Sequence, residues 1–146
     1  MGKLTDGGLP SSLRALFMAV EFRTIAVRAP NWIGDAVMSM PLVACVRTNA
    51  PRARLVLVAK PGVVPVYRDC PHIDDVLQVP HAAGSAGVQE TVRRLRPWRF
   101  DAAWVLPNSF KTAAEFLLAG VPERIGYRRD ARGLLLTQAV PRPSVN

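Results

Sequence analysis

Short apolar runs alternate with helical patterns along most of this 146-residue chain, and this alternation limits its possible folds. The apolar runs predict five buried strands, over residues 24–28, 54–59, 75–79, 101–106 and 124–127. Helical patterns lie between them, over residues 35–48, 62–68, 88–96 and 109–119. Helical crossovers between apolar strands require a parallel sheet with right-handed connections. The predicted fold class is therefore α/β, with a doubly wound parallel sheet.

Length and charge narrow the class of protein. A chain of 146 residues suits one domain that buries roughly 70% of its unfolded surface. Its 19 basic and 11 acidic residues give a formal net charge of +8, which indicates an anionic partner. Nucleic acid, a phosphorylated glycolipid and an anionic membrane face all fit this charge. No stretch approaches the ~20 apolar residues of a membrane span, and Cys45 and Cys70 are expected to be free, mostly buried thiols.

The two ends of the chain are expected to lie outside the main domain. Residues 1–22 are interpreted as an N-terminal extension, in which the apolar spacing over residues 11–20 predicts a short amphipathic helix capped by a serine. The extension lacks the early basic stretch and the long apolar core of a secretory signal. Residues 23–140 form the predicted domain, and the proline-containing residues 141–146 are interpreted as the start of a linker.

The turn after the first strand carries a carboxylate, because Asp35 follows Gly34 directly. In an open α/β sheet this turn lies at the carboxyl edge of the strands, where ligands bind. A carboxylate held there can serve as a base at a cleft. Aspartate is also a favoured helix N-cap, and both roles stay open at this stage. Pro41 is expected to kink the following helix or to move its start to Ser39.

Basic and polar residues end other predicted strands. Arg28 ends the first predicted strand, and Lys60 ends the second. These two cations could focus positive potential at the carboxyl edge of the sheet, or they could serve only to keep the strand ends soluble. Asn108 and Ser109 follow the fourth strand and can present an amide and a hydroxyl to a sugar, although Ser109 is also a natural helix cap. Lys111 can meet a phosphate or a carboxylate, or can be a solvated lysine of the first turn.

Several common site signatures are missing from the sequence. No GxGxxG motif follows the first strand, and no GxxxxGK[ST] motif occurs, so neither a dinucleotide fingerprint nor a P-loop is present. His72 and His81 are too isolated to form a zinc site, and the acidic pair Asp74 and Asp75 is interpreted as structural. The sequence therefore predicts no metal site.

Three segments of the chain resemble a known enzyme family. They are residues 28–39 (RAPNWIGDAVMS), residues 106–111 (LPNSFK) and residues 124–130 (RIGYRRD), with residues 133–137 (GLLLT) fitting as well. In this order they resemble the ADP-heptose:lipopolysaccharide heptosyltransferases of glycosyltransferase family 9, and within it the heptosyltransferase II type. The likeness runs from about residue 24 to residue 143.

The resemblance implies the N-terminal half of a GT-B glycosyltransferase, with a Rossmann-like domain on the acceptor side and a C-terminal donor domain that is absent here. It implies inverting transfer of heptose from ADP-heptose to the lipopolysaccharide inner core, without metal or cofactor, and an inactive chain when alone. Asp35 takes the place of the general base. The residues expected to bind substrate are Arg28, Asn31, Lys60, Asn108, Ser109, Lys111 and Arg128. The implied location is cytoplasmic, peripheral at the anionic inner face of the inner membrane.

Two other functions can be weighed from the residues. The chain could be a non-catalytic α/β module that binds anionic glycan or lipid. It could also bind nucleic acid, which would need aromatic stacking platforms or a recognition helix. The three tryptophans are scattered, so no nucleic-acid partner is expected.

Overall fold

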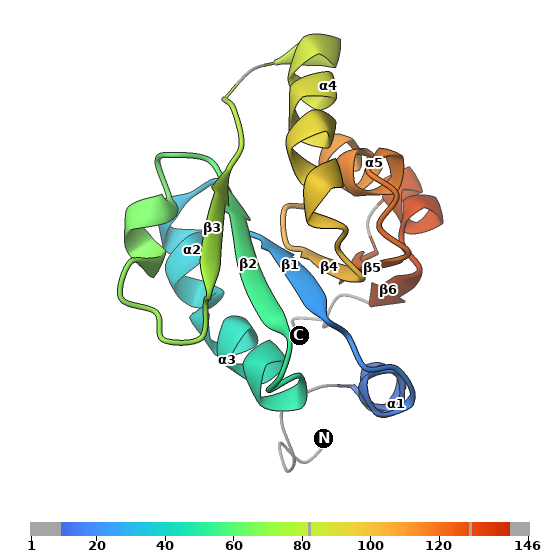
Figure 1. Cartoon of the computed structure of the whole chain (residues 1–146). Coiled ribbons are helices and arrows are strands. Elements are labelled where there is room, and N and C mark those ends of the chain that lie inside the picture. The colour runs from blue at the N-terminus through green and yellow to red at the C-terminus, as the bar shows by residue number, and fades with distance from the viewer. Residues whose placement is uncertain (1–9, 82, 129, 141–146) are drawn as a thin grey trace, which may run out of the picture.

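The computed structural model describes residues 10–81, 83–128 and 130–140, which form a twisted sheet with helices on both faces (Figure 1). All neighbouring strands pair in parallel, and the order across the sheet is β3-β2-β1-β4-β5-β6. The strands are β1 (Thr24–Arg28), β2 (Arg54–Ala59), β3 (Asp75–Gln78), β4 (Ala102–Val105), β5 (Glu123–Tyr127) and β6 (Gln138–Val140). The predicted α/β class and doubly wound parallel sheet are confirmed. The sequence did not predict β6.

The helices divide between the two faces of the sheet. On one face lie α1 (Ser11–Ala19), α2 (Ile33–Met38), α3 (Met40–Asn49) and the 3₁₀ turn η1 (Val64–Tyr67). On the other face lie α4 (Gly84–Leu95), the 3₁₀ turn η2 (Arg96–Trp98) and α5 (Phe110–Leu118). A third 3₁₀ segment, η3 (Asp130–Leu135), packs beside α5 before β6 begins.

Each face of the sheet has its own apolar core. Because successive side chains of a strand point to opposite faces, Ile25 and Val27 of β1 join the core under α1, α2 and α3, whereas Ala26 joins the core under α4 and α5. The strands β1, β2 and β4 are almost completely buried, as expected for a parallel sheet covered on both faces. This burial fixes where the strands end, and therefore where their terminal residues lie.

Three local predictions need correction. The helix predicted over residues 35–48 is two helices that meet at Ser39, because Pro41 fits the first turn of α3 but not a helix interior. The helix predicted to begin at residue 88 begins at Gly84, whose φ of 74° suits glycine. The predicted serine cap of α1 is wrong, because Pro10 occupies the cap position and no side chain caps the helix. Of the predicted terminal segments, residues 1–9 and 141–146 lie outside the described residues.

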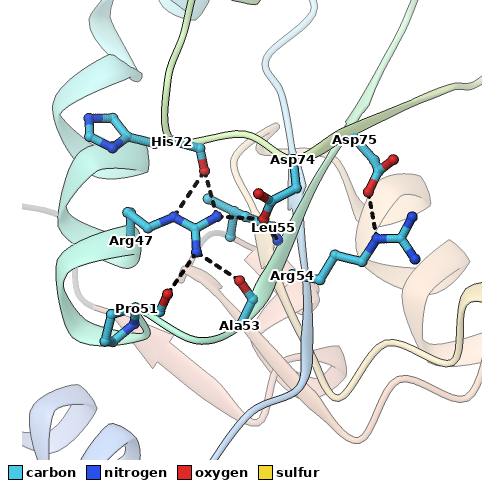
Figure 2. A network of polar contacts seen from close by, with 8 residues as sticks. All are labelled: Arg47, Pro51, Ala53, Arg54, Leu55, His72, Asp74 and Asp75. Carbon is cyan, nitrogen blue, oxygen red and sulfur yellow. Dashed lines mark hydrogen bonds and ion pairs between the residues drawn. The ribbon is translucent and has the colours of Figure 1, made fainter.

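A polar network ties the first part of the sheet together at its amino edge (Figure 2). Arg47 of α3 donates to the His72 carbonyl at 2.8 and 3.1 Å, to the Ala53 carbonyl at 2.7 Å and to the Asp74 carboxylate at 2.6 Å. Asp74 also accepts a hydrogen bond from the Leu55 amide at 2.8 Å, which holds the pKa of this carboxyl below its ordinary value. Asp75 accepts a hydrogen bond from Arg54 at 2.5 Å, so the acidic pair at 74–75 is structural, as predicted from the sequence.

Candidate functional site

The carboxyl edge of the sheet forms an open groove of about 870 Å³. Its walls come from the β1–α2 turn with α2, from the β4–α5 turn, and from the end of β5 at Tyr127. The sequence-predicted site residues on the groove are Asn31, Asp35, Asn108 and Ser109. The fold therefore brings two of the resembling segments, residues 28–39 and 106–111, to the same edge of the sheet.

Asp35 lies in the first turn of α2 with its side chain exposed at the groove. It is not the N-cap, because Trp32 holds that position and no side chain caps this helix. The capping interpretation of Asp35 is therefore wrong. An acidic residue in the first turn still complements the positive end of the helix. The carboxylate thus stays accessible to a bound molecule instead of turning in beneath the sheet.

Arg28 and Asn31 brace the turn that precedes α2. The Arg28 guanidinium donates to the Ala29 carbonyl at 2.6 Å and to Oδ1 of Asn31 at 3.2 Å. Arg28 is only 3% exposed, and its burial lowers the pKa of the guanidinium. The arginine therefore holds Asn31 at the wall of the groove and does not itself extend into solvent.

Asn108 and Ser109 form the opposite wall, where β4 gives way to α5. Ser109 is the N-cap of α5 and accepts a hydrogen bond from the Thr112 amide at 3.2 Å, so its predicted capping role is confirmed. Asn108 is exposed on the groove beside it. Beneath this turn, the buried guanidinium of Arg132 donates to the Val105 carbonyl at 3.0 Å and to the Pro107 carbonyl. The turn is thus held by the Ser109 cap of α5 and by the Arg132 guanidinium.

A smaller pocket of about 70 Å³ adjoins the groove and shares Asn31 and Ser109 with it. Three sequence-predicted cations line this pocket: Arg28, Lys60 and Lys111. Glu115, on the second turn of α5, faces the same pocket and is 5% exposed. Burial raises the pKa of Glu115, whereas the three cations act to lower it. Burial, Arg28 and Lys111 together lower the pKa of Lys60.

The structure gathers most but not all of the predicted site residues. Arg128 is exposed and lines neither the groove nor the smaller pocket. Sequence reasoning missed Tyr127, although it ends a predicted strand and the rule applied to Arg28 and Lys60 would have found it. It also missed Glu115, whose only signal was its position one helical turn after Lys111.

Neither a metal centre nor a membrane span is found in the part of the chain that the structure describes. Within residues 10–81, 83–128 and 130–140, no three histidine, cysteine, aspartate or glutamate side chains gather as metal ligands would. The helices of these same residues are all too short or too polar to cross a membrane.

Known proteins resemble this chain in both sequence and structure. It is 35% identical over 118 residues to lipopolysaccharide heptosyltransferase 2 of Salmonella typhimurium, covering 79% of this chain and 34% of the relative. The enzyme of the same name from Escherichia coli is 35% identical over 115 residues, covering 76% and 33%. The chain therefore spans about a third of the length of the curated relatives it matches. No protein-family model matches it.

Solved structures agree with the sequence relatives. The structure of E. coli ADP-heptose lipopolysaccharide heptosyltransferase II matches with a TM-score of 0.67 at 33% identity, covering 77% of this chain and 33% of that one. A glycosyltransferase family 9 protein from Veillonella parvula matches with a TM-score of 0.70 at 17% identity, which supports the fold alone. The predicted resemblance to this family of glycosyltransferases, and the Rossmann-like fold of its N-terminal half, are confirmed.

Proposed function

We propose that this chain, which matches about a third of lipopolysaccharide heptosyltransferase 2, is the acceptor-binding half of an inverting, metal-independent glycosyltransferase. The enzyme would move heptose from ADP-heptose to the inner core of lipopolysaccharide. The observation that carries the proposal is the exposed Asp35 carboxylate, which lines a groove with Asn31 and Asn108 at the carboxyl edge of a parallel sheet.

Asp35 supplies the base that such a transfer needs. As an acceptor hydroxyl oxygen attacks the anomeric carbon of the heptose, the bond from that carbon to the diphosphate breaks, and ADP leaves with the electron pair. The hydroxyl proton passes to the Asp35 carboxylate, which is open to the groove. A positioned base contributes roughly 10²–10⁴-fold to the rate. The leaving diphosphate requires positive charge around it but no acid.

The remaining predicted residues hold the acceptor in this proposal. Asn31 lines one wall of the groove, and Asn108 and Ser109 line the other, where their amide and hydroxyl groups can contact sugar hydroxyls. Arg28, Lys60 and Lys111 supply positive charge next to it. Arg128 lies outside both cavities, so its role would be restricted to a more distant part of a large glycolipid.

The other half of the reaction is assigned to a donor-binding domain outside these residues. Support comes from the length of the relatives, of which this chain covers about a third. In this proposal residues 23–140 form the acceptor domain, residues 1–22 precede it, and residues 141–146 lead toward the donor domain. The chain would then bind acceptor but transfer no heptose alone, and its net charge of +8 would favour peripheral contact with an anionic membrane.

A joined protein tests this proposal. The chain is fused to the part of the E. coli relative that it does not cover, and transfer of heptose from ADP-heptose to heptose-deficient lipopolysaccharide is measured. We expect the fusion to transfer heptose and the 146-residue chain alone to transfer none. Acceptor binding by the chain, with an inactive and folded fusion, would instead favour a non-catalytic module that binds anionic glycan or lipid. The smaller cationic pocket is the observation that favours that second function.

A further inference from the structure

We propose that the smaller pocket, at the ends of β1 and β2 and against α5, binds one oxyanion group and that Glu115 is the built-in competitor of that anion. The oxyanion would be a phosphate or carboxylate substituent of the sugar bound in the groove. The identity of this sugar rests on the proposed function. The pocket itself is separate from Asp35, which lines only the groove.

The size of the pocket suits a small group. Its volume of about 70 Å³ leaves room for a few heavy atoms, since a single water needs only about 10–15 Å³ by such a measure. The groove next to it is more than ten times larger, at about 870 Å³. A sugar ring therefore fits in the groove, and a substituent of that sugar can enter the pocket past Asn31 and Ser109, which border both.

The Arg28 guanidinium is the strongest reason to assign an anion here. The two groups that accept hydrogen bonds from it, the Ala29 carbonyl and the Asn31 amide oxygen, are neutral, and its buried Nε has no hydrogen-bond partner among the described residues. Arg28 is nevertheless only 3% exposed. A buried charge is costly unless it is paired. Glu115 supplies part of the negative charge near Arg28, and an oxyanion in the pocket would supply more.

The charges of the residues that line the pocket also favour an anion. Among the residues that line the pocket, three are cationic and one, Glu115, is acidic, and all three cations act on its carboxyl. The pKa of Lys60 is lowered by burial, by Arg28 and by Lys111, so the cations are close enough to repel one another. Glu115 offsets part of this repulsion. An incoming oxyanion would compete with Glu115 for the same positive charge, and its affinity would be limited by that competition.

A titration of the 146-residue chain with three related sugars tests the inference. Glucose 6-phosphate carries a phosphate, glucuronate carries a carboxylate, and glucose is neutral. Amide shifts are followed by two-dimensional NMR. We expect the charged sugars to shift Lys60, Thr91 and Thr112, which line the pocket, and glucose to shift none of them. The charged sugar that binds more tightly identifies the oxyanion as phosphate or carboxylate.

Two variants distinguish binding in this pocket from a general attraction of anions to a basic protein. Lys60→Gln is expected to weaken binding of the charged sugar at least tenfold, about the loss of one charge-assisted hydrogen bond. The matched control is Arg52→Gln, which removes one positive charge just before β2, at the opposite edge of the sheet, where the Arg52 side chain is 87% exposed. It is expected to change the affinity less than twofold. Equal weakening by both variants would overturn the inference.

Glu115→Gln tests the competitor. Because this variant removes the carboxylate and keeps its shape, we expect it to bind the charged sugar at least threefold more tightly than the unchanged chain. Weaker or unchanged binding, in a variant whose amide spectrum shows a folded chain, would contradict the assignment. These binding measurements do not depend on heptose transfer. The oxyanion pocket can therefore be refuted while the proposed transferase function stands, and the transferase function can be refuted while the pocket stands.

Discussion

Arg132 is the largest side chain in the described residues with less than 2% of its surface exposed. It lies beneath the turn that carries Asn108 and Ser109, and it donates to the carbonyls of Val105 and Pro107. Within the part of the chain that the structure describes, no ion pair neutralises it, and burial lowers the pKa of its guanidinium. Its function in the fold is therefore to satisfy the backbone at the end of β4, which keeps one wall of the groove in place.

Replacing Arg132 should loosen that wall. Arg132→Met removes both donors, so we expect the free energy of unfolding to fall by about 1–3 kcal/mol, as for buried acceptors that lose their partner. Urea unfolding measures this change. Arg52→Met is the control, because the Arg52 side chain is 87% exposed and its loss should change the free energy by less than about 0.5 kcal/mol. Equal stability of the two variants would refute the role given to Arg132.

Gly126 is required next to the same arginine. A Cβ atom at this position would meet the Arg132 guanidinium and would come within 2.9 Å of the Val105 carbonyl oxygen. Both neighbours are fixed, one of them as backbone. Gly126→Ala is therefore expected to destabilise the chain by about 1–3 kcal/mol, the usual cost of overpacking. Gly34→Ala is the comparison in thermal unfolding, because a Cβ there would meet no atom within 4 Å beyond its chain neighbours and the backbone of its own helix. If Gly126→Ala were as stable as Gly34→Ala, the contact at Gly126 would be absent.

Single residues also show how far sequence reasoning reaches. Asp35, Asn108 and Ser109 could be predicted at one edge, because parallel strands carry their terminal residues to the same side of the sheet. Whether Asp35 capped α2 could not be predicted, since the cap depends on where the helix starts, and it starts two residues earlier. Glu115 was missed because its burial arises from β1, β2 and α5 together, which are far apart in the sequence.

At the scale of elements, α4 is held by an exposed ion-pair cluster. Glu90 accepts hydrogen bonds from Arg93 at 2.6 and 2.8 Å and from Arg94 at 2.9 Å, and Arg94 also donates to the Gln78 carbonyl of β3. These contacts lower the pKa of Glu90 from 4.5 to about 2, with Arg93 as the main cause. The cluster thus ties the helix to the edge strand of the sheet.

The lowered pKa of Glu90 predicts how stability depends on pH. A carboxyl whose pKa is depressed in the folded state stabilises the protein above its unfolded value, and this contribution is lost as the pH falls from 4.5 toward about 2. We expect Glu90→Gln to reduce the fall in thermal stability across this interval. The control is Glu21→Gln, because the exposed ion pair of Glu21 with Arg52 is long, at 4.0 Å. Identical pH profiles for the two variants would contradict this account.

The elements differ in how well the sequence predicted them. The bounds of β1 and β2 agree with the prediction, because long runs of buried apolar residues mark a central strand of a parallel sheet. The start of α4 was placed four residues too late, since glycine and alanine give no apolar periodicity over residues 84–87. β6 has only three half-buried residues, so its pairing with β5 is decided by tertiary contacts rather than by a local pattern.

At the scale of the whole molecule, the net charge of +8 predicts weak binding to anionic surfaces. We expect the chain to sediment with vesicles that contain anionic lipid and not with purely zwitterionic vesicles. Binding should fall steeply between low salt and about 0.5 M salt, because screening shortens the range of surface electrostatics. Binding that persists at high salt would instead indicate insertion of apolar side chains, and would contradict peripheral contact driven by charge.

The whole molecule also presents exposed apolar side chains around the groove. Trp32 is 76% exposed, Met38 79% and Phe110 55%, and each lies at or beside the carboxyl edge of the sheet. In the proposed enzyme this edge is the side that meets the sugar donor, so acceptor, base and donor come together there. The central claim is that Asp35 removes the proton of the acceptor hydroxyl at this edge.

The most direct test is the rate of heptose transfer by the joined protein with Asp35→Asn, measured beside its affinity for the acceptor. The claim predicts a rate at least about 100-fold lower, because the amide cannot accept the proton, with acceptor affinity changed less than about threefold. Asp69→Asn, which removes an exposed carboxylate that lines no part of the groove, should retain full activity. An Asp35→Asn protein that transfers heptose at the normal rate would contradict the account.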